Sequence, residues 1–169
     1  MKKCLLTGMA GIALKPKTND STAIVDPRLA EIGTCLYRVS VKAVIINERR
    51  EILCVQEDRE MWWGLPGGGL EYGENYIDAL RRELTEELSV PSSQITIEPD
   101  IIMFANEEVY AHLPRVQFYV RCHLHRFDIK AADDIQAIGW FTAEQLSGLK
   151  LSTSMPPIMP QLLTYLQKV

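Results

Sequence analysis

A glycine-rich loop that runs directly into an acidic helix is the feature of this chain that most restricts its fold. Gly68 is followed after five residues by Glu74 and, after seven more, by the segment Arg82-Glu83-Leu84-Thr85-Glu86-Glu87. At an average residue frequency of about 6%, the six fixed positions coincide by chance at only about 10⁻⁸ of start points. The spacing therefore indicates that loop and helix form one functional unit.

Helical geometry predicts that the carboxylates of this segment share a face. Residues three and four positions apart lie side by side on a helix, so Glu83, Glu86 and Glu87 are expected to converge. An apolar stripe at helical period should bury the other side, and it consists of Ile77, Leu80, Leu84 and Leu88. Three neighbouring acids repel one another without a counter-charge, and Mg²⁺ or Mn²⁺ prefers carboxylate and phosphate oxygens. The pattern predicts a divalent metal held against a diphosphate.

The arginine and the glycines support the same reading. Arg82 lies four residues before Glu86 and eight after Glu74, so it is expected to pair with both and to orient them. Gly68 lies within a run of three glycines, which permits close backbone approach, and a carbonyl there is expected to reach the metal. Each charge by itself is also typical of a solvated helix face. The coincidence of glycine loop and carboxylate face favours a site.

With these residues the chain resembles the Nudix hydrolases, whose signature it matches from Gly68 to Val90. The segment from Trp63 to Gly68 is similar to the usual lead into that signature, and the segment from Trp140 to Leu146 is similar to the family's closing segment. The resemblance implies an α+β fold, an α/β/α sandwich around a mixed β-sheet. One position departs: Ser89 stands where the family usually has glycine in a left-handed turn, which serine adopts only at some cost.

The resemblance also implies an activity. It implies metal-dependent hydrolysis of a nucleoside diphosphate linked to another moiety, either a nucleoside triphosphate or a nucleotide sugar such as ADP-ribose, by attack of water on phosphorus. The implied metal ligands are Glu83, Glu86, Glu87, Gly68 through its carbonyl, and Asp134, for which a solvated loop acid is the alternative. The implied catalytic residues are Glu86 or Glu83 as general base, with Arg82 and Glu74 as the orienting pair. The alternative function is a Nudix-like nucleotide-binding or regulatory module that does not hydrolyse its ligand.

Three aromatic residues are candidates for contact with the nucleotide. Trp63, Phe104 and Tyr110 could stack on a base, and each could equally be a packing residue of its strand or loop. The loops that read the rest of a substrate carry no further motif that selects among nucleotides.

Apolar runs predict the remaining elements. Strands are expected at 39–46, 52–56, 95–97, 101–105, 116–124 and 138–140, with the first two forming a hairpin, and helices at 142–147 and 157–167. Residues 1–35 are polar around 15–26 and are expected to be an N-terminal extension, with the Nudix domain at 36–169.

Composition restricts the setting of this domain. A chain of 169 residues with 47% hydrophobic content can bury one sizeable core. A net charge of -4 with dispersed basic residues argues against a nucleic-acid surface and leaves a small nucleotide as the expected partner, with a homodimer left open. Four scattered cysteines without metal-site spacing favour a reducing compartment, so we expect a cytoplasmic protein without a membrane span.

Overall fold

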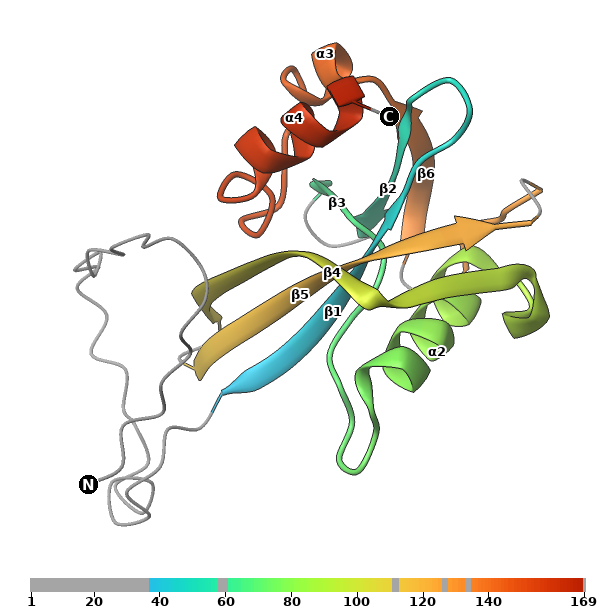
Figure 1. Cartoon of the computed structure of the whole chain (residues 1–169), viewed down its shortest axis with the longest axis vertical. Coiled ribbons are helices and arrows are strands. Elements are labelled where there is room, and N and C mark those ends of the chain that lie inside the picture. The colour runs from blue at the N-terminus through green and yellow to red at the C-terminus, as the bar shows by residue number, and fades with distance from the viewer. Residues whose placement is uncertain (1–36, 58–60, 111–112, 126–127, 133–134, 169) are drawn as a thin grey trace.

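Two three-stranded sheets form the centre of the computed structural model, which describes residues 37–57, 61–110, 113–125, 128–132 and 135–168 (Figure 1). The first sheet has the order β1 (Arg38–Ile45), β5 (Leu113–Leu124), β4 (Ile95–Tyr110). It is mixed, because β1 and β5 run parallel whereas β4 and β5 run antiparallel. The second sheet has the order β3 (Trp63–Gly64), β2 (Ile52–Glu57), β6 (Ile135–Phe141) and is antiparallel.

Helices cover these sheets from two sides. They are α2 (Tyr76–Leu88), α3 (Ala143–Leu146) and α4 (Met159–Lys168), with a 3₁₀ turn at Ser92–Gln94. The start of α2 is set by Asn75, whose side chain accepts hydrogen bonds from the backbone N–H groups of Ile77 and Asp78. The layered arrangement confirms the expected α+β sandwich around a mixed sheet.

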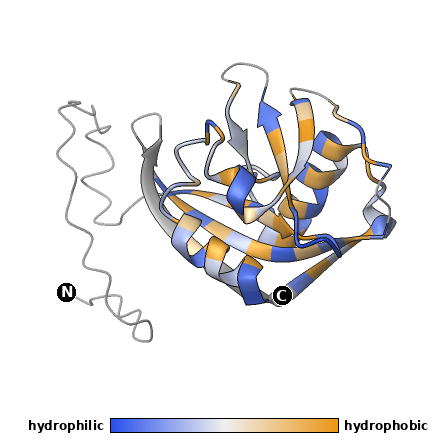
Figure 2. Cartoon of the chain, turned by 90° about the horizontal axis from the view of Figure 1, so that it is seen from above, coloured by the Kyte–Doolittle hydropathy of each residue, from blue (hydrophilic) through white to orange (hydrophobic). Residues whose placement is uncertain are grey.

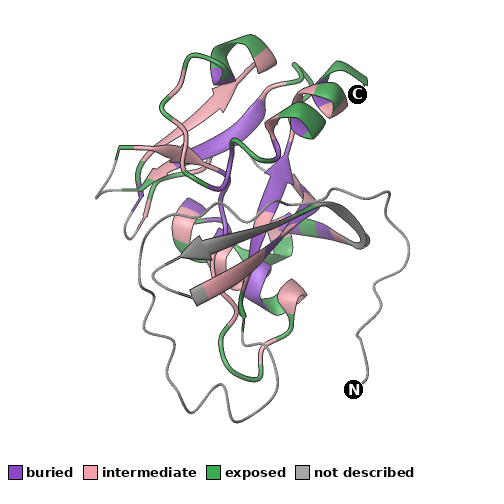
Figure 3. Ribbon diagram, turned by 90° about the vertical axis from the view of Figure 1, so that its left-hand side faces the viewer, coloured by how far each residue is buried: buried purple, intermediate pink, exposed green. Residues whose placement is uncertain are grey.

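Alternation along β1 separates two hydrophobic cores. Val41, Ala43 and Ile45 face α2, whose Leu80, Leu84 and Leu88 are fully buried as the apolar stripe predicts. Val44 faces the other way, toward the core under α3 and α4. Figure 2 shows hydrophobic and hydrophilic residues interspersed along the coloured helices and strands, and Figure 3 shows the buried residues concentrated in the central strands. The alternation of side chains along the strands and their spacing of three to four residues along the helices therefore decide which residues enter each core.

The predicted hairpin of the first two strands is wrong. The strands β1 and β2 belong to different sheets and meet only at a single bridge between Ile46 and Ile52. The polar turn is formed as expected, with the Asn47 and Glu51 backbones hydrogen-bonded at 3.0 Å. β2 is buried on both faces and is the central strand of its sheet, whereas β1 is an edge strand of the other sheet and pairs with β5 instead.

Other boundaries differ in extent. The two strands predicted at 95–97 and 101–105 are one strand, β4, in which irregularities at Ile97/Ile102 and Ile102/Phe104 interrupt the register. The two-residue strand β3 was not predicted, and β6 extends beyond its predicted core. The expected extension, residues 1–35, lies outside the described residues. Within the part of the chain that is described, no helix combines the length and hydropathy needed to cross a membrane.

Candidate active site

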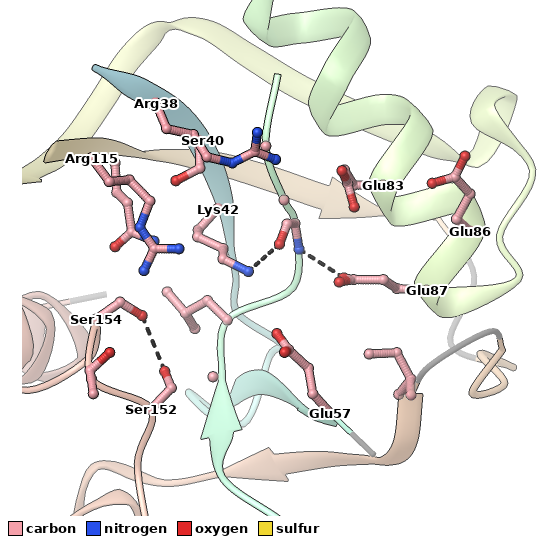
Figure 4. A pocket seen from close by; sticks show the side chains of 18 residues that line it. Arg38, Ser40, Lys42, Glu57, Glu83, Glu86, Glu87, Arg115, Ser152 and Ser154 are labelled. Carbon is pink, nitrogen blue, oxygen red and sulfur yellow. Dashed lines mark hydrogen bonds between the residues drawn. The ribbon is translucent and has the colours of Figure 1, made fainter. Parts of the chain in front are cut away.

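A cavity of about 660 Å³ opens where the glycine loop meets α2 and the two sheets (Figure 4). Its charged lining consists of the acids Glu57, Glu83, Glu86 and Glu87 and the bases Arg38, Lys42 and Arg115. Figure 4 shows the acids of α2 on one side and the bases of β1 and β5 on the other. The cavity therefore has an acidic half and a basic half.

The glycine loop is fixed to the edge of β1 by backbone hydrogen bonds. The Ala43 N–H donates to the Pro66 carbonyl at 2.8 Å, and the Val41 N–H donates to the Gly68 carbonyl at 2.9 Å. Gly67, between these two contacts, has a φ of 119°, and a Cβ there would collide with the Val41 carbonyl. Only glycine fits this position, so the Gly67 peptide can lie at the cavity wall.

Gly67 links the acidic half of the cavity to the basic half through its two backbone polar groups. Its N–H donates to Glu87 Oε2 at 2.8 Å, and its carbonyl accepts from the Lys42 ammonium. Burial raises the pKa of Glu87 to about 7, with the Glu83 and Glu57 charges adding to the rise and Lys42 and the Gly67 N–H opposing it. An additional cation beside Glu87 would relieve the cost of its charge.

Arg82 holds the acidic helix to the loop. Its Nε and Nη2 donate to the two oxygens of Glu74 at 3.1 and 3.0 Å, and its Nη1 donates to Glu83 at 2.9 Å and to Glu86 at 3.1 Å. The hydrogen bond from Arg82 holds the pKa of Glu74 below its usual range. The predicted pairing of Arg82 with both Glu74 and Glu86 is thus present in the structure.

The three helix carboxylates line one cavity without forming a compact group. Glu83 lies directly against Gly68, where a Cβ would collide with its carboxylate. Its side chain is 17% exposed, whereas that of Glu86 is 47% exposed. Among the residues the structure describes, no three acid, histidine or cysteine side chains are disposed around one point, although Glu83 and Glu86 accept from the same nitrogen of Arg82. The donor set is nevertheless all oxygen, with the Gly67 carbonyl beside it, and this chemistry fits Mg²⁺ or Mn²⁺.

Comparison with known proteins identifies this arrangement of loop and helix. The family model of the NUDIX domain matches residues 36–163. The chain belongs to the Nudix family. The Nudix match confirms the resemblance seen between Gly68 and Val90.

Several relatives and solved structures are similar to this Nudix chain. Over 129 residues it is 32% identical to nucleoside triphosphatase NudI of Enterobacter sp. (strain 638), covering 68% of this chain and 89% of that protein. Over 61 residues it is 39% identical to an RNA pyrophosphohydrolase of Ruthia magnifica, covering 36% of this chain but only 34% of that protein. The crystal structure of a MutT NUDIX hydrolase from Burkholderia pseudomallei superposes with a TM-score of 0.63 at 24% identity, covering 75% of this chain and 98% of that chain. The last comparison supports the fold.

The position at which this chain departs from the Nudix signature has the expected backbone. Ser89 ends α2 with a φ of 52° and a ψ of 33°, which is the left-handed conformation that glycine adopts without a Cβ penalty. The helix therefore ends in the turn that the family pattern implies, although serine occupies it.

The remaining predicted residues have different outcomes. The Gly68 carbonyl is turned to β1, whereas the Gly67 carbonyl lies in the cavity, so a metal contact of Gly68 stays a prediction.

The three aromatic candidates lie in paired strands. Trp63 packs edge-on against Phe141 with ring centroids 4.7 Å apart and is absent from the described cavity lining. Phe104 and Tyr110 lie on β4 opposite Tyr119 and Leu113. Asp134 lies outside the described residues. The nucleotide contacts proposed for the three aromatics also stay predictions.

The basic half of the cavity was missed in the sequence. Arg38, Ser40 and Lys42 alternate along β1, and Arg115 and Gln117 alternate along β5, all on the cavity side. A polar residue at every second position of an otherwise apolar strand was the available signal. It was not decisive, because the same alternation is typical of a strand with one face in water.

Proposed function

We propose that this protein is a metal-dependent pyrophosphohydrolase that cleaves the diphosphate of a nucleoside triphosphate or of a nucleotide sugar such as ADP-ribose. The observation that carries the proposal is the two-sided cavity, in which Glu83, Glu86 and Glu87 face Arg38, Lys42 and Arg115. Carboxylates on one side suit divalent cations, and the bases on the other suit phosphate oxygens. A diphosphate fits between the two halves.

The metal site would use Glu83, Glu86 and Glu87 with a carbonyl of the glycine loop. Bound Mg²⁺ or Mn²⁺ would acidify water and stabilise charge on phosphate oxygens. Arg82 keeps Glu83 and Glu86 at the cavity wall by its hydrogen bonds to them. Asp134 remains a proposed further ligand.

The chemical step is attack of a water oxygen on phosphorus. A new P–O bond forms, the bridging P–O bond breaks, and the leaving phosphate group keeps the bonding electron pair. Glu86 or Glu83 accepts the proton of the water as general base. Lys42, Arg38 and Arg115 balance the charge of the phosphates on the opposite side.

The nucleoside triphosphate reading has additional support from a relative named nucleoside triphosphatase, which the chain covers over 89% of its length. Removal of diphosphate from an RNA end is the second candidate, because other relatives are named RNA pyrophosphohydrolases. The net charge of -4 weighs against an extended RNA surface. We further propose a cytoplasmic location, which suits the buried free thiols Cys54 and Cys122.

The test is release of phosphate and pyrophosphate from a panel of substrates with Mg²⁺ or Mn²⁺. The panel contains the nucleoside triphosphates, ADP-ribose, nucleotide sugars, dinucleoside polyphosphates and a 5′-triphosphate RNA. Glu83→Gln and Glu86→Gln should each lose nearly all turnover with the fold retained, whereas Glu48→Gln, exposed in the β1–β2 turn, should match the wild type. No turnover by wild-type protein on any member would favour the non-catalytic nucleotide-binding module.

A further inference from the structure

One pair of neutral residues lies at the floor of the cavity, on adjacent strands. Ser40 of β1 and Gln117 of β5 are register partners in the parallel pair, so their side chains stand side by side on the same face of the sheet. Ser40 is 2% exposed and Gln117 is fully buried, and both line the cavity. Figure 4 shows Ser40, Ser152 and Ser154 on the opposite side of the cavity from the carboxylates of α2.

These two buried side chains are incompletely hydrogen-bonded. Among the described residues, Ser40 Oγ and Gln117 Nε2 have no hydrogen-bond partner, and the two neighbours do not bond to each other. A buried polar atom without a partner costs free energy. Polar atoms that are buried at a cavity wall and left without a protein partner are therefore suited to a group that enters the cavity.

Tyr119 restricts which atom of Gln117 faces the cavity. Its phenol oxygen lies 3.0 Å from Gln117 Oε1 and 3.0 Å from the Ser154 carbonyl oxygen. Burial raises the pKa of Tyr119 to about 12, so the phenol keeps its proton at neutral pH. One proton cannot serve two acceptors, and both of these oxygens only accept.

One rotation of the amide resolves this conflict. When the phenol donates to the Ser154 carbonyl, its oxygen can accept from Gln117, provided that Nε2 points toward Tyr119. The Gln117 carbonyl oxygen then points into the cavity in place of the amide nitrogen. An oxygen acceptor at this wall repels phosphate oxygens and suits a neutral N–H donor.

We propose that Gln117, held in this orientation by Tyr119, determines specificity by accepting a hydrogen bond from an amino group on the edge of the nucleobase, with Ser40 as the neighbouring contact. This inference rests on the proposed function, because it places the diphosphate between the α2 carboxylates and the basic side chains, and the nucleobase at the buried floor of the cavity. Gln117 would touch the ligand, whereas Tyr119 would act through Gln117 as a positioning residue. Bases that present a keto oxygen at that position would meet the acceptor and be disfavoured.

The test compares matched nucleotides that differ in this group, CTP with UTP and ATP with ITP. In wild-type protein, kcat/KM should favour the amino member of at least one pair by roughly tenfold or more. Gln117→Met should bring that ratio close to one by lowering the rate for the amino member. Tyr119→Phe, which frees the amide to rotate, should bring the ratio toward one by raising the rate for the keto member. Gln161→Met, exposed on α4, should leave the ratio unchanged.

A second readout separates this inference from the proposed function. The rise in melting temperature with CMP against UMP, and with AMP against IMP, measures binding without turnover. Preference for the amino member in binding without hydrolysis would leave the inference standing and remove the proposed activity. Equal rates and equal binding in wild-type protein would overturn the inference alone. So would a Gln117→Met variant that loses activity equally for every nucleotide, because that result places phosphate at Gln117.

Discussion

Glu87 and Gly67 are joined by a hydrogen bond of 2.8 Å from the backbone N–H of the glycine to the carboxylate. The carbonyl of the same glycine accepts a hydrogen bond from Lys42. The end of α2, the glycine loop and β1 therefore meet at one residue, Gly67. Changes in this part of the loop should separate the stability of the fold from the chemistry of the site.

Alanine at the two adjacent glycines should affect two different properties, stability at Gly67 and activity at Gly68. Gly67→Ala should cost about 2–3 kcal/mol of stability, because the residue has positive φ and its Cβ would meet the backbone of Val41. Gly68→Ala should largely retain stability but lose on the order of 10²-fold in kcat, because its Cβ displaces the flexible carboxylate of Glu83. Urea denaturation and steady-state kinetics measure the two effects. Equal loss of stability in both variants would contradict this assignment.

Removing the charge at position 87 should stabilise the metal-free protein. The pKa of Glu87 is about 7 in the folded protein against 4.5 ordinarily, so the folded state holds the proton more tightly. Its contribution to stability therefore falls as pH rises from about 4.5 to about 7 and stays low above that. Glu87→Gln should gain up to about 3 kcal/mol at pH 8 and little at pH 5, while losing activity. Urea titrations in chelator at both pH values check this, with Glu48→Gln as the control that should show no gain.

Millimolar Mg²⁺ or Mn²⁺ should raise the melting temperature of the wild type. A ligand at about 100 times its Kd adds about 2.7 kcal/mol to the free energy of unfolding. The rise should be much smaller in Glu87→Gln, which has one fewer anionic oxygen donor at the cavity. Thermal melting curves of both proteins with and without each metal measure this rise. An equal rise in melting temperature in both proteins would exclude Glu87 as a metal ligand.

Lysine at position 82 should not be able to orient the acids that Arg82 contacts. The guanidinium contacts Glu74 with two nitrogens and reaches Glu83 and Glu86 with a third, a geometry that an ammonium cannot reproduce. We expect Arg82→Lys to lower kcat by roughly tenfold or more. Arg81→Lys is the matched control, because Arg81 donates to the carbonyls of Ser92 and Ile95 and not to the acids. Comparable kcat losses in the two variants would argue against an orienting role.

Glycine at position 89 should stabilise the protein without changing activity. The left-handed conformation of Ser89 costs free energy, and removal of its Cβ should raise the free energy of unfolding by about 1 kcal/mol. Ser93→Gly is the control, since Ser93 lies in the 3₁₀ turn and glycine there should lose about 0.5 kcal/mol through backbone entropy. Thermal denaturation of both variants distinguishes the two signs.

The amino-acid sequence by itself determined the local part of the site. The spacing of Arg82 from Glu74 and Glu86 placed their side chains within reach, and the apolar period of α2 selected the face that is buried. Because the geometry of a helix is regular, side chains that lie on one face can be recognised from their spacing in the amino-acid sequence. The left-handed turn at Ser89 was expected only from the family pattern, which has glycine there, and the structure shows that serine adopts it.

Only the tertiary structure decided the opposite wall of the cavity. Ser40 and Gln117 lie far apart in the chain and become neighbours through the parallel register of β1 and β5. That non-local pairing also put β1 and β2 into separate sheets. The hydrogen bonds of the glycine loop to β1 turned the Gly68 carbonyl to that strand and left the Gly67 carbonyl to Lys42. Residue periodicity shows that a strand exists but not which strand pairs with it, because pairing and register depend on how whole faces are buried.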